Sequence, residues 1–115
     1  MTLLKTHLIK IMTMVASMFK NRPKAYLATK VSDLPLSKVK AVLHRMEVRA
    51  IKEGYDTINP LIIGNQKLSW EENMKICIRA MLTCDVVYAS QWRNSPGATI
   101  EVELARKLGI KVIEI

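Results

Sequence analysis

Cysteine is scarce in this chain, and the spacing of the two cysteines argues against a zinc site. The 115 residues contain only Cys77 and Cys84, seven apart, with no CxxC pair and no histidine cluster nearby to complete a tetrahedral ligand set. We expect two reduced, buried thiols and no metal or other cofactor. Reduced thiols are typical of the cytoplasm, where the chain is predicted to act.

Long apolar runs are also missing. The longest uncharged run near the start, IMTMVASMF, is far shorter than the roughly 20 residues that a membrane-spanning helix needs. No good cleavage site follows it. The sequence therefore predicts neither a membrane span nor an exported protein.

Acidic residues are nearly absent from the first third of the chain. The formal net charge is +8, and residues 1 to 40 hold eight Lys or Arg against Asp33 alone. Such an excess can attract nucleic acid or an anionic surface. However, no DNA-reading motif or aromatic-interleaved basic groove accompanies it, so nucleic acid is not expected as a partner. A solvated face, or a field that attracts a phosphate-bearing small molecule, is the favoured interpretation.

Residues 1 to 20 are predicted to form an N-terminal amphipathic helix ahead of one α/β domain over residues 21 to 115. The helix carries apolar residues at spacings of three and four: Leu4, Leu8, Ile11 or Met12, Val15, and Met18 or Phe19. We favour a stripe that packs on the domain or on a second subunit of a homo-oligomer. The alternative is a helix that lies in a membrane interface, helped by Lys5 and Lys10.

From residue 24 onward, predicted strands and helices alternate. Ser37 is expected to cap the first of these helices and Gly54 to end it, while Ser69 and Glu72 fit a capping box that opens a helix with Trp70 facing the core. The expected strands are KAYLATKV, DTINPL, DVVYA and KVIEI, and a further helix spans residues 97 to 108. This alternation predicts a parallel sheet with helices on both faces.

The predicted fold is α/β of the flavodoxin-like (Rossmann-like) type, with strand order 2-1-3-4. A crevice is then expected beyond the carboxyl ends of the first and third strands, lined by ATKVSD and SQWRNSPGATIE. Glu101 falls beside this crevice near the start of a helix, where the dipole favours an ionised carboxylate. Glu103 lies about 200° further around the helix and should point away. Dipole preference alone is another possible reason for an acid at this position.

The closing segment, CDVVYASQWRNSPGATIEVELARKLGIKVIEI, resembles the last third of the small DUF4406 proteins of unknown function. These are themselves similar to nucleoside 2-deoxyribosyltransferases and 2'-deoxynucleoside 5'-monophosphate N-glycosidases. The resemblance extends through KAYLATKV, INPL and SWEENM, over about residues 24 to 115. The matching positions are Asp85, Trp92, Ser95, Gly97, Ala98, Glu101 and Ala105.

The resemblance implies that Glu101 attacks the sugar carbon that bears the base, which gives a covalent glycosyl-enzyme. It also implies that Ser95 lies near a 5'-phosphate, where N–H groups around Gly97 can assist, and that Tyr26 lies near the sugar. A turn in which Ser95 merely caps the helix, and a tyrosine that only satisfies its own hydrogen bonds, are the alternatives.

Three more residues are candidates for ligand contacts, each with a structural alternative. Trp92 can stack on a nucleobase, or it can cover the loop or an oligomer contact. Asn59 lies at the end of the second strand, where it can contact a ligand or be an ordinary sheet residue. In the families that the chain resembles, the turn after the first strand is rich in glycine, and here Thr29 and Lys30 stand in its place. The charge of Lys30 can either compensate for the lost glycines by attracting a phosphate or block the site.

The proton donor for the leaving base is not identified in the sequence. The resemblance places that acid in the helix before the third strand, where this chain has Asn73 and Cys77, with Glu71 and Glu72 earlier. Asp85 begins its strand at the far end and is read as structural. The chain also stops at Ile115, where the characterised relatives continue and complete their sites with a neighbouring subunit's residues.

The predicted function is therefore a nucleoside or nucleotide N-glycosidic-bond enzyme, a 2-deoxyribosyltransferase or N-glycosidase, with a small-molecule nucleoside or nucleotide as partner. The alternative is a module of the same fold that binds a nucleotide or metabolite without turnover, and the missing acid leaves the enzymatic assignment open. A third possibility is that the N-terminal helix mediates assembly or contact with an anionic polymer.

Overall fold

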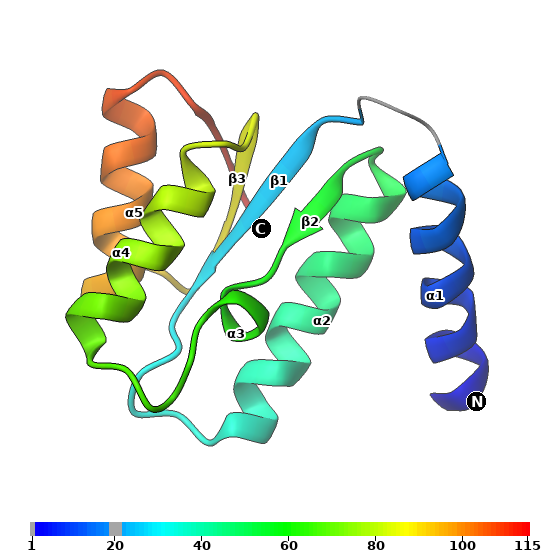
Figure 1. The fold of residues 1–115 in the computed structure, drawn as a ribbon, viewed down its shortest axis with the longest axis horizontal. Coiled ribbons are helices and arrows are strands. Elements are labelled where there is room, and N and C mark those ends of the chain that lie inside the picture. The colour runs from blue at the N-terminus through cyan, green and yellow to red at the C-terminus, as the bar shows by residue number, and fades with distance from the viewer. Residues whose placement is uncertain (1, 19–21) are drawn as a thin grey trace.

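The computed structural model describes residues 2–18 and 22–115, and its core is one four-stranded parallel sheet. The strand order β2-β1-β3-β4 confirms the predicted order (Figure 1). Ala25 of β1 lies opposite Val86 of β3, and the pairing continues to Thr29 opposite Ser90. The strands are β1 (Lys24–Thr29), β2 (Asp56–Ile58), β3 (Val86–Ser90) and β4 (Lys111–Glu114).

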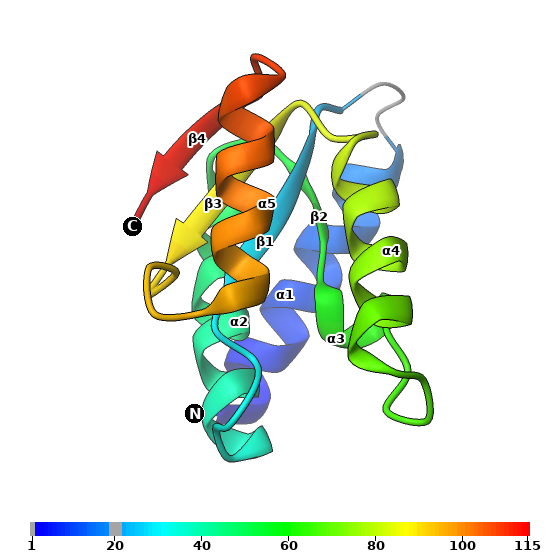
Figure 2. The ribbon, with the colours of Figure 1, turned by 90° about the vertical axis from the view of Figure 1, so that its left-hand side faces the viewer.

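Helices cover both faces of the sheet, as predicted. Helices α4 (Trp70–Met81) and α5 (Pro96–Lys107) pack on one face and α2 (Leu36–Lys52) on the other (Figures 1 and 2). Side chains of a strand alternate between faces, so Tyr26 belongs to the core under α4 and α5, and Leu27 to the core under α2. β1 and β3 are therefore buried almost throughout, as expected for central parallel strands.

Most helix ends follow the signals in the sequence, and one does not. The Ser69 hydroxyl accepts a hydrogen bond from the Glu72 backbone N–H at 3.1 Å, which confirms the capping box, and Gly54 adopts φ of 103° just after α2. The cap predicted at Ser37 is wrong, because α2 begins at Leu36 after Pro35, and Ser37 lies inside the helix.

A side-chain hydrogen bond joins two segments at the edge of the sheet away from the crevice, and a short helix that the sequence pattern missed follows β2. The Asp85 carboxylate accepts from the Lys24 backbone N–H at 2.8 Å, at the opposite end of β1 from the crevice, so Asp85 is structural as expected. The second strand ends at Ile58, two residues before the predicted stop at Pro60, and Pro60 instead starts the short helix α3 (Pro60–Ile63). Both cysteines are free and buried.

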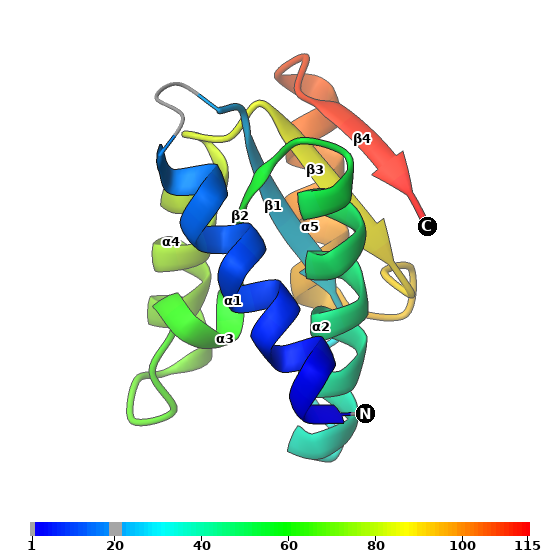
Figure 3. The same ribbon diagram turned by 90° about the vertical axis from the view of Figure 1, so that its right-hand side faces the viewer.

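Helix α1 (Thr2–Met18) lies beside α2 and β2, outside the two layers that cover the sheet (Figures 1 and 3). Leu8 and Ile11 of the predicted apolar stripe are 55% and 56% exposed, so these two residues do not pack on the domain. Phe19, the boundary at residues 20 and 21, and the side chains of Leu4, Val15 and Met18 lie outside the described residues. Over residues 2–18 and 22–115, none of the helices has the length and apolar character required to pass through a bilayer.

Candidate functional site

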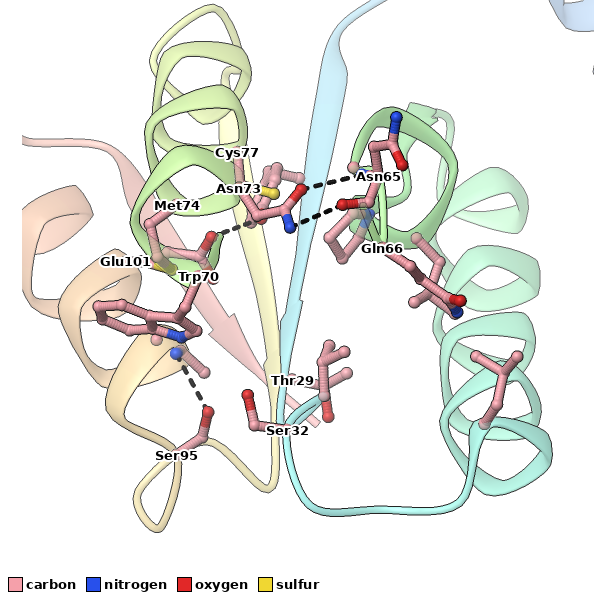
Figure 4. A pocket seen from close by; sticks show the side chains of 18 of the residues that line it. Thr29, Ser32, Asn65, Gln66, Trp70, Asn73, Met74, Cys77, Ser95 and Glu101 are labelled. Atoms are coloured by element: carbon pink, nitrogen blue, oxygen red, sulfur yellow. Dashed lines mark hydrogen bonds between the residues drawn. The ribbon is translucent and has the colours of Figure 1, made fainter. Parts of the chain in front are cut away.

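A pocket of about 360 Å³ opens at the carboxyl edge of the sheet, where the sequence places the crevice (Figure 4). One wall comes from α4 and the start of α5, and the facing wall from the loop after β1, the start of α2, α3 and the loop that follows it. In a parallel sheet these helices all begin at the edge where the strands end, so loops far apart in sequence converge there.

Glu101 and Tyr26 lie together in this pocket. The Tyr26 hydroxyl donates a hydrogen bond of 2.5 Å to Oε2 of Glu101, and Glu101 is only 5% exposed. The other carboxylate oxygen, Oε1, has no hydrogen-bond donor in the part of the chain that the structure describes. In Glu101, therefore, Oε2 is hydrogen-bonded to Tyr26 and Oε1 is available to a ligand.

Burial dominates the electrostatics of this pair. Loss of solvent raises the pKa of Glu101 to about 7, and the hydrogen bond from Tyr26 opposes that rise. The sequence led us to expect a carboxylate kept charged by the helix dipole, but Glu101 is the sixth residue of α5 and the dipole acts mainly within the first turn. Burial and the negative charge of Glu101 raise the pKa of the Tyr26 hydroxyl far above its ordinary value, so Tyr26 remains a hydrogen-bond donor.

Ser95 and Gly97 also line the pocket, at the start of α5. Ser95 is the N-cap, and its Oγ accepts from the Ala98 backbone N–H at 3.2 Å, which leaves the hydroxyl proton for an acceptor on a ligand. A Cβ on Gly97 would stand 3.0 Å from the sulfur of Met74. Glycine therefore permits the close approach of α5 to α4 at this wall.

Three candidates from the sequence do not line the pocket: Lys30, Asn59 and Trp92. Asn59 caps α3 and donates through Nδ2 to Glu47 at 3.3 Å. Trp92 is buried in the core, and its indole N–H donates to Glu114 at 2.9 Å. The turn that carries Trp92 looks exposed in the sequence, but tertiary packing folds the ring inward.

Trp70 and Lys40 line the pocket and were not among the sequence candidates. Trp70 was expected to face the core, yet it is 44% exposed, because it is the first residue of α4 and extends past the edge of the sheet. Lys40 lies on α2, across the pocket. The signal that could have found both is topological: the N-terminal parts of α2 and α4 must lie at the carboxyl edge of the sheet.

Asn73 and Cys77, at the positions where a proton donor was sought, serve other roles. The Asn73 side chain accepts from the Asn65 N–H and donates to the Asn65 carbonyl, both at 2.9 Å (Figure 4), so it holds the loop after α3. Burial raises the pKa of the Cys77 thiol, which lies beside Tyr26. Glu71 and Glu72 are exposed and do not line the pocket.

A family model described as a domain of unknown function (DUF4406) matches residues 23–114, so the chain belongs to the DUF4406 family. Among curated proteins, none matches the chain.

Proposed function

We propose that this DUF4406 protein cleaves or transfers the N-glycosidic bond of a nucleoside or its monophosphate, with Glu101 as the nucleophile. The observation that carries the proposal is the buried Glu101 carboxyl group in a pocket of about 360 Å³, which is within the size range of small-molecule sites. Its Oε1 carries no hydrogen bond among the described residues, and Tyr26 holds Oε2.

In the proposed reaction, Oε1 of ionised Glu101 bonds to the sugar carbon that bears the base. The bond from that carbon to the base nitrogen breaks, and its electron pair leaves with the base. Water or a second base then attacks the same carbon and releases Glu101. Tyr26 orients the carboxylate, while the Ser95 hydroxyl and the backbone N–H of Gly97 bind the sugar or its phosphate.

A second candidate function, binding without turnover, is favoured by one observation. Glu101 is the only carboxyl group that lines the pocket within residues 2–18 and 22–115, whereas retaining glycosidases generally use two. With its pKa at about 7, Glu101 is also only partly ionised at neutral pH and can serve as a hydrogen-bond donor to a bound base.

The first test is release of free base, measured by chromatography, from a mixed set of nucleosides and 5'-monophosphates that includes both ordinary and N-alkylated bases. We expect the unmodified protein to release base and Glu101→Gln to be slower by on the order of 10³-fold or more, because the amide is a poor nucleophile. Glu103→Gln, which changes an exposed acid on the same helix, is the matched control.

Equal release by the Glu101→Gln and unmodified proteins would exclude Glu101 as the nucleophile. If neither protein releases base but calorimetry detects nucleotide binding, the binding module is the correct function.

We propose in addition that a second copy of the chain covers the exposed stripe of α1. Leu8 and Ile11 are both more than half exposed, and apolar patches of this kind often mark interfaces. We expect Leu8→Ser with Ile11→Ser to lower the mass measured by light scattering to that of a monomer, whereas Ile62→Ser, at an exposed residue of α3, should not. A monomeric mass for the unmodified protein would rule the interface out.

A further inference from the structure

Glu101 supplies the only negative charge among the described residues that line the pocket, and the groups beside it release protons poorly. Among the described residues that line the pocket, there is no other carboxyl group and no histidine. Tyr26 and Cys77 bear protons there, but the pKa values of both are raised, so both release a proton poorly. The side-chain amide of Asn73 is engaged with the loop after α3. Lys40, the other charged group of the lining that bears a proton, stands on the facing wall, so a neutral base that leaves beside Glu101 would depart without protonation by a neighbouring side chain.

An aromatic face stands on the same side of the pocket as Glu101. Trp70 begins α4, and its indole nitrogen would lie 3.8 Å from a Cβ on Gly97 of α5, so the ring borders the helix that carries Glu101 (Figure 4). The ring is 44% exposed, and its N–H has no acceptor among the described residues. Indole faces bind cations, most strongly where water is partly excluded. The one lysine that lines the described pocket, Lys40, belongs to α2 on the facing wall.

From this arrangement we infer that the substrates are N-glycosides whose base is already positively charged, such as N-alkylated purine or pyridinium nucleosides. This inference rests on the proposed function. Trp70 binds the cationic ring, and Glu101 supplies the opposite charge and the nucleophile. Lys40, across the pocket, is placed for an anionic group of the same substrate. A cationic ring beside Glu101 also favours the ionised carboxylate that the attack requires.

The reaction then balances without an acid. Oε1 of Glu101 bonds to the sugar carbon, the bond from that carbon to the base nitrogen breaks, and its electron pair neutralises the positive charge of the base. In the second step the oxygen of a water molecule bonds to the sugar carbon and the ester bond to Oε1 breaks. The electron pair of that bond restores the Glu101 carboxylate, and the proton of the water passes to solvent.

The test compares 7-methyl-2'-deoxyguanosine with 2'-deoxyguanosine, which differ by one methyl group and one positive charge. Each rate of base release is divided by the rate in buffer alone, because the cationic nucleoside is intrinsically more labile. We expect release above the buffer rate only for the methylated nucleoside, with loss of that release in Glu101→Gln. Trp70→Ala should raise KM for it by about 3- to 10-fold, Trp70→Phe should restore most of the binding, and Ile62→Ala should change nothing.

The pH profile with nicotinamide riboside, whose ring keeps its charge, gives a second readout. We expect kcat/KM, which reports the free protein, to rise through the ionisation of Glu101 near pH 7 and then to stay level, because no acid needs to remain protonated. Equal acceleration of both deoxyguanosines, or a fall in rate at alkaline pH, would overturn the inference and leave the proposed function standing. Release from no nucleoside, neutral or cationic, would overturn both.

Discussion

The Glu101→Gln protein is expected to be more stable than the unmodified protein at pH 8, by up to about 3 kcal/mol. Burial raises the pKa of Glu101 from the ordinary 4.5 to about 7, so the folded state holds a proton that the unfolded chain has already lost between these two pH values. The stability that this proton contributes is fully present below pH 4.5 and is lost as the pH rises through 7. Glutamine does not ionise and avoids that loss.

The measurement is denaturant unfolding of the two proteins at pH values from 4.5 to 8. Subtracting one curve from the other cancels the contributions of groups that they share, such as Glu114 with its lowered pKa. The difference should grow with pH and level off above 7. Glu103→Gln serves as the control, because that side chain is exposed on the same helix and should track the unmodified protein. A constant difference between Glu101→Gln and the unmodified protein would contradict the buried, proton-holding environment.

The fold was predictable because its signals are local and agree with one another. The alternation of strands and helices predicted the parallel sheet. Two helix ends also fell where expected, the end of α2 at Gly54 and the start of α4 at Ser69. The cap at Ser37 failed because Pro35, with its fixed φ, already sets the start of α2 two residues earlier. A serine and a proline both favour a helix start here, and the sequence alone does not show which of the two signals decides it.

The site was predictable where topology alone decides position. Tyr26, Ser95, Gly97 and Glu101 all line the pocket, because the switch point between β1 and β3 brings their segments together. Trp92 belongs to one of these segments too, yet its ring packs into the core. Whether a loop side chain points into a pocket or away from it depends on tertiary contacts, such as its bond to Glu114, that lie far away in sequence.

The facing wall was harder to predict because its residues share no local motif. Trp70 is the first residue of α4 and Lys40 the fifth residue of α2, and Asn73, which also lines the pocket, holds the loop after α3. Each of these residues looks ordinary in its own segment. Their common feature, a place at the carboxyl edge of the sheet, exists only once the strand order is known.

Replacing Tyr26 with phenylalanine is expected to raise the pKa of Glu101 further, above its value of about 7. The Tyr26 hydroxyl stabilises the ionised carboxylate through a bond of 2.5 Å, and a hydrogen bond to a charged group contributes roughly 1.5–3 kcal/mol, so the midpoint should move up by about one pH unit or more. Titration of the ¹³C-labelled glutamate carboxyl groups by NMR measures this directly. Base release, if Glu101 is the nucleophile, should fall about 5- to 10-fold at pH 7 and recover at alkaline pH.

Tyr88 provides the matched control, because it too is a buried strand tyrosine whose hydroxyl donates to a glutamate, Glu53. It packs in the core under α2, on the face of the sheet away from Glu101, so Tyr88→Phe should leave the Glu101 titration unchanged. A Glu101 midpoint that stays the same in Tyr26→Phe would mean that burial alone sets the pKa of the carboxyl group. In that case Tyr26 would lose its role in keeping the Glu101 carboxylate charged, and the pH at which the proposed nucleophile ionises would depend only on how well the pocket excludes water.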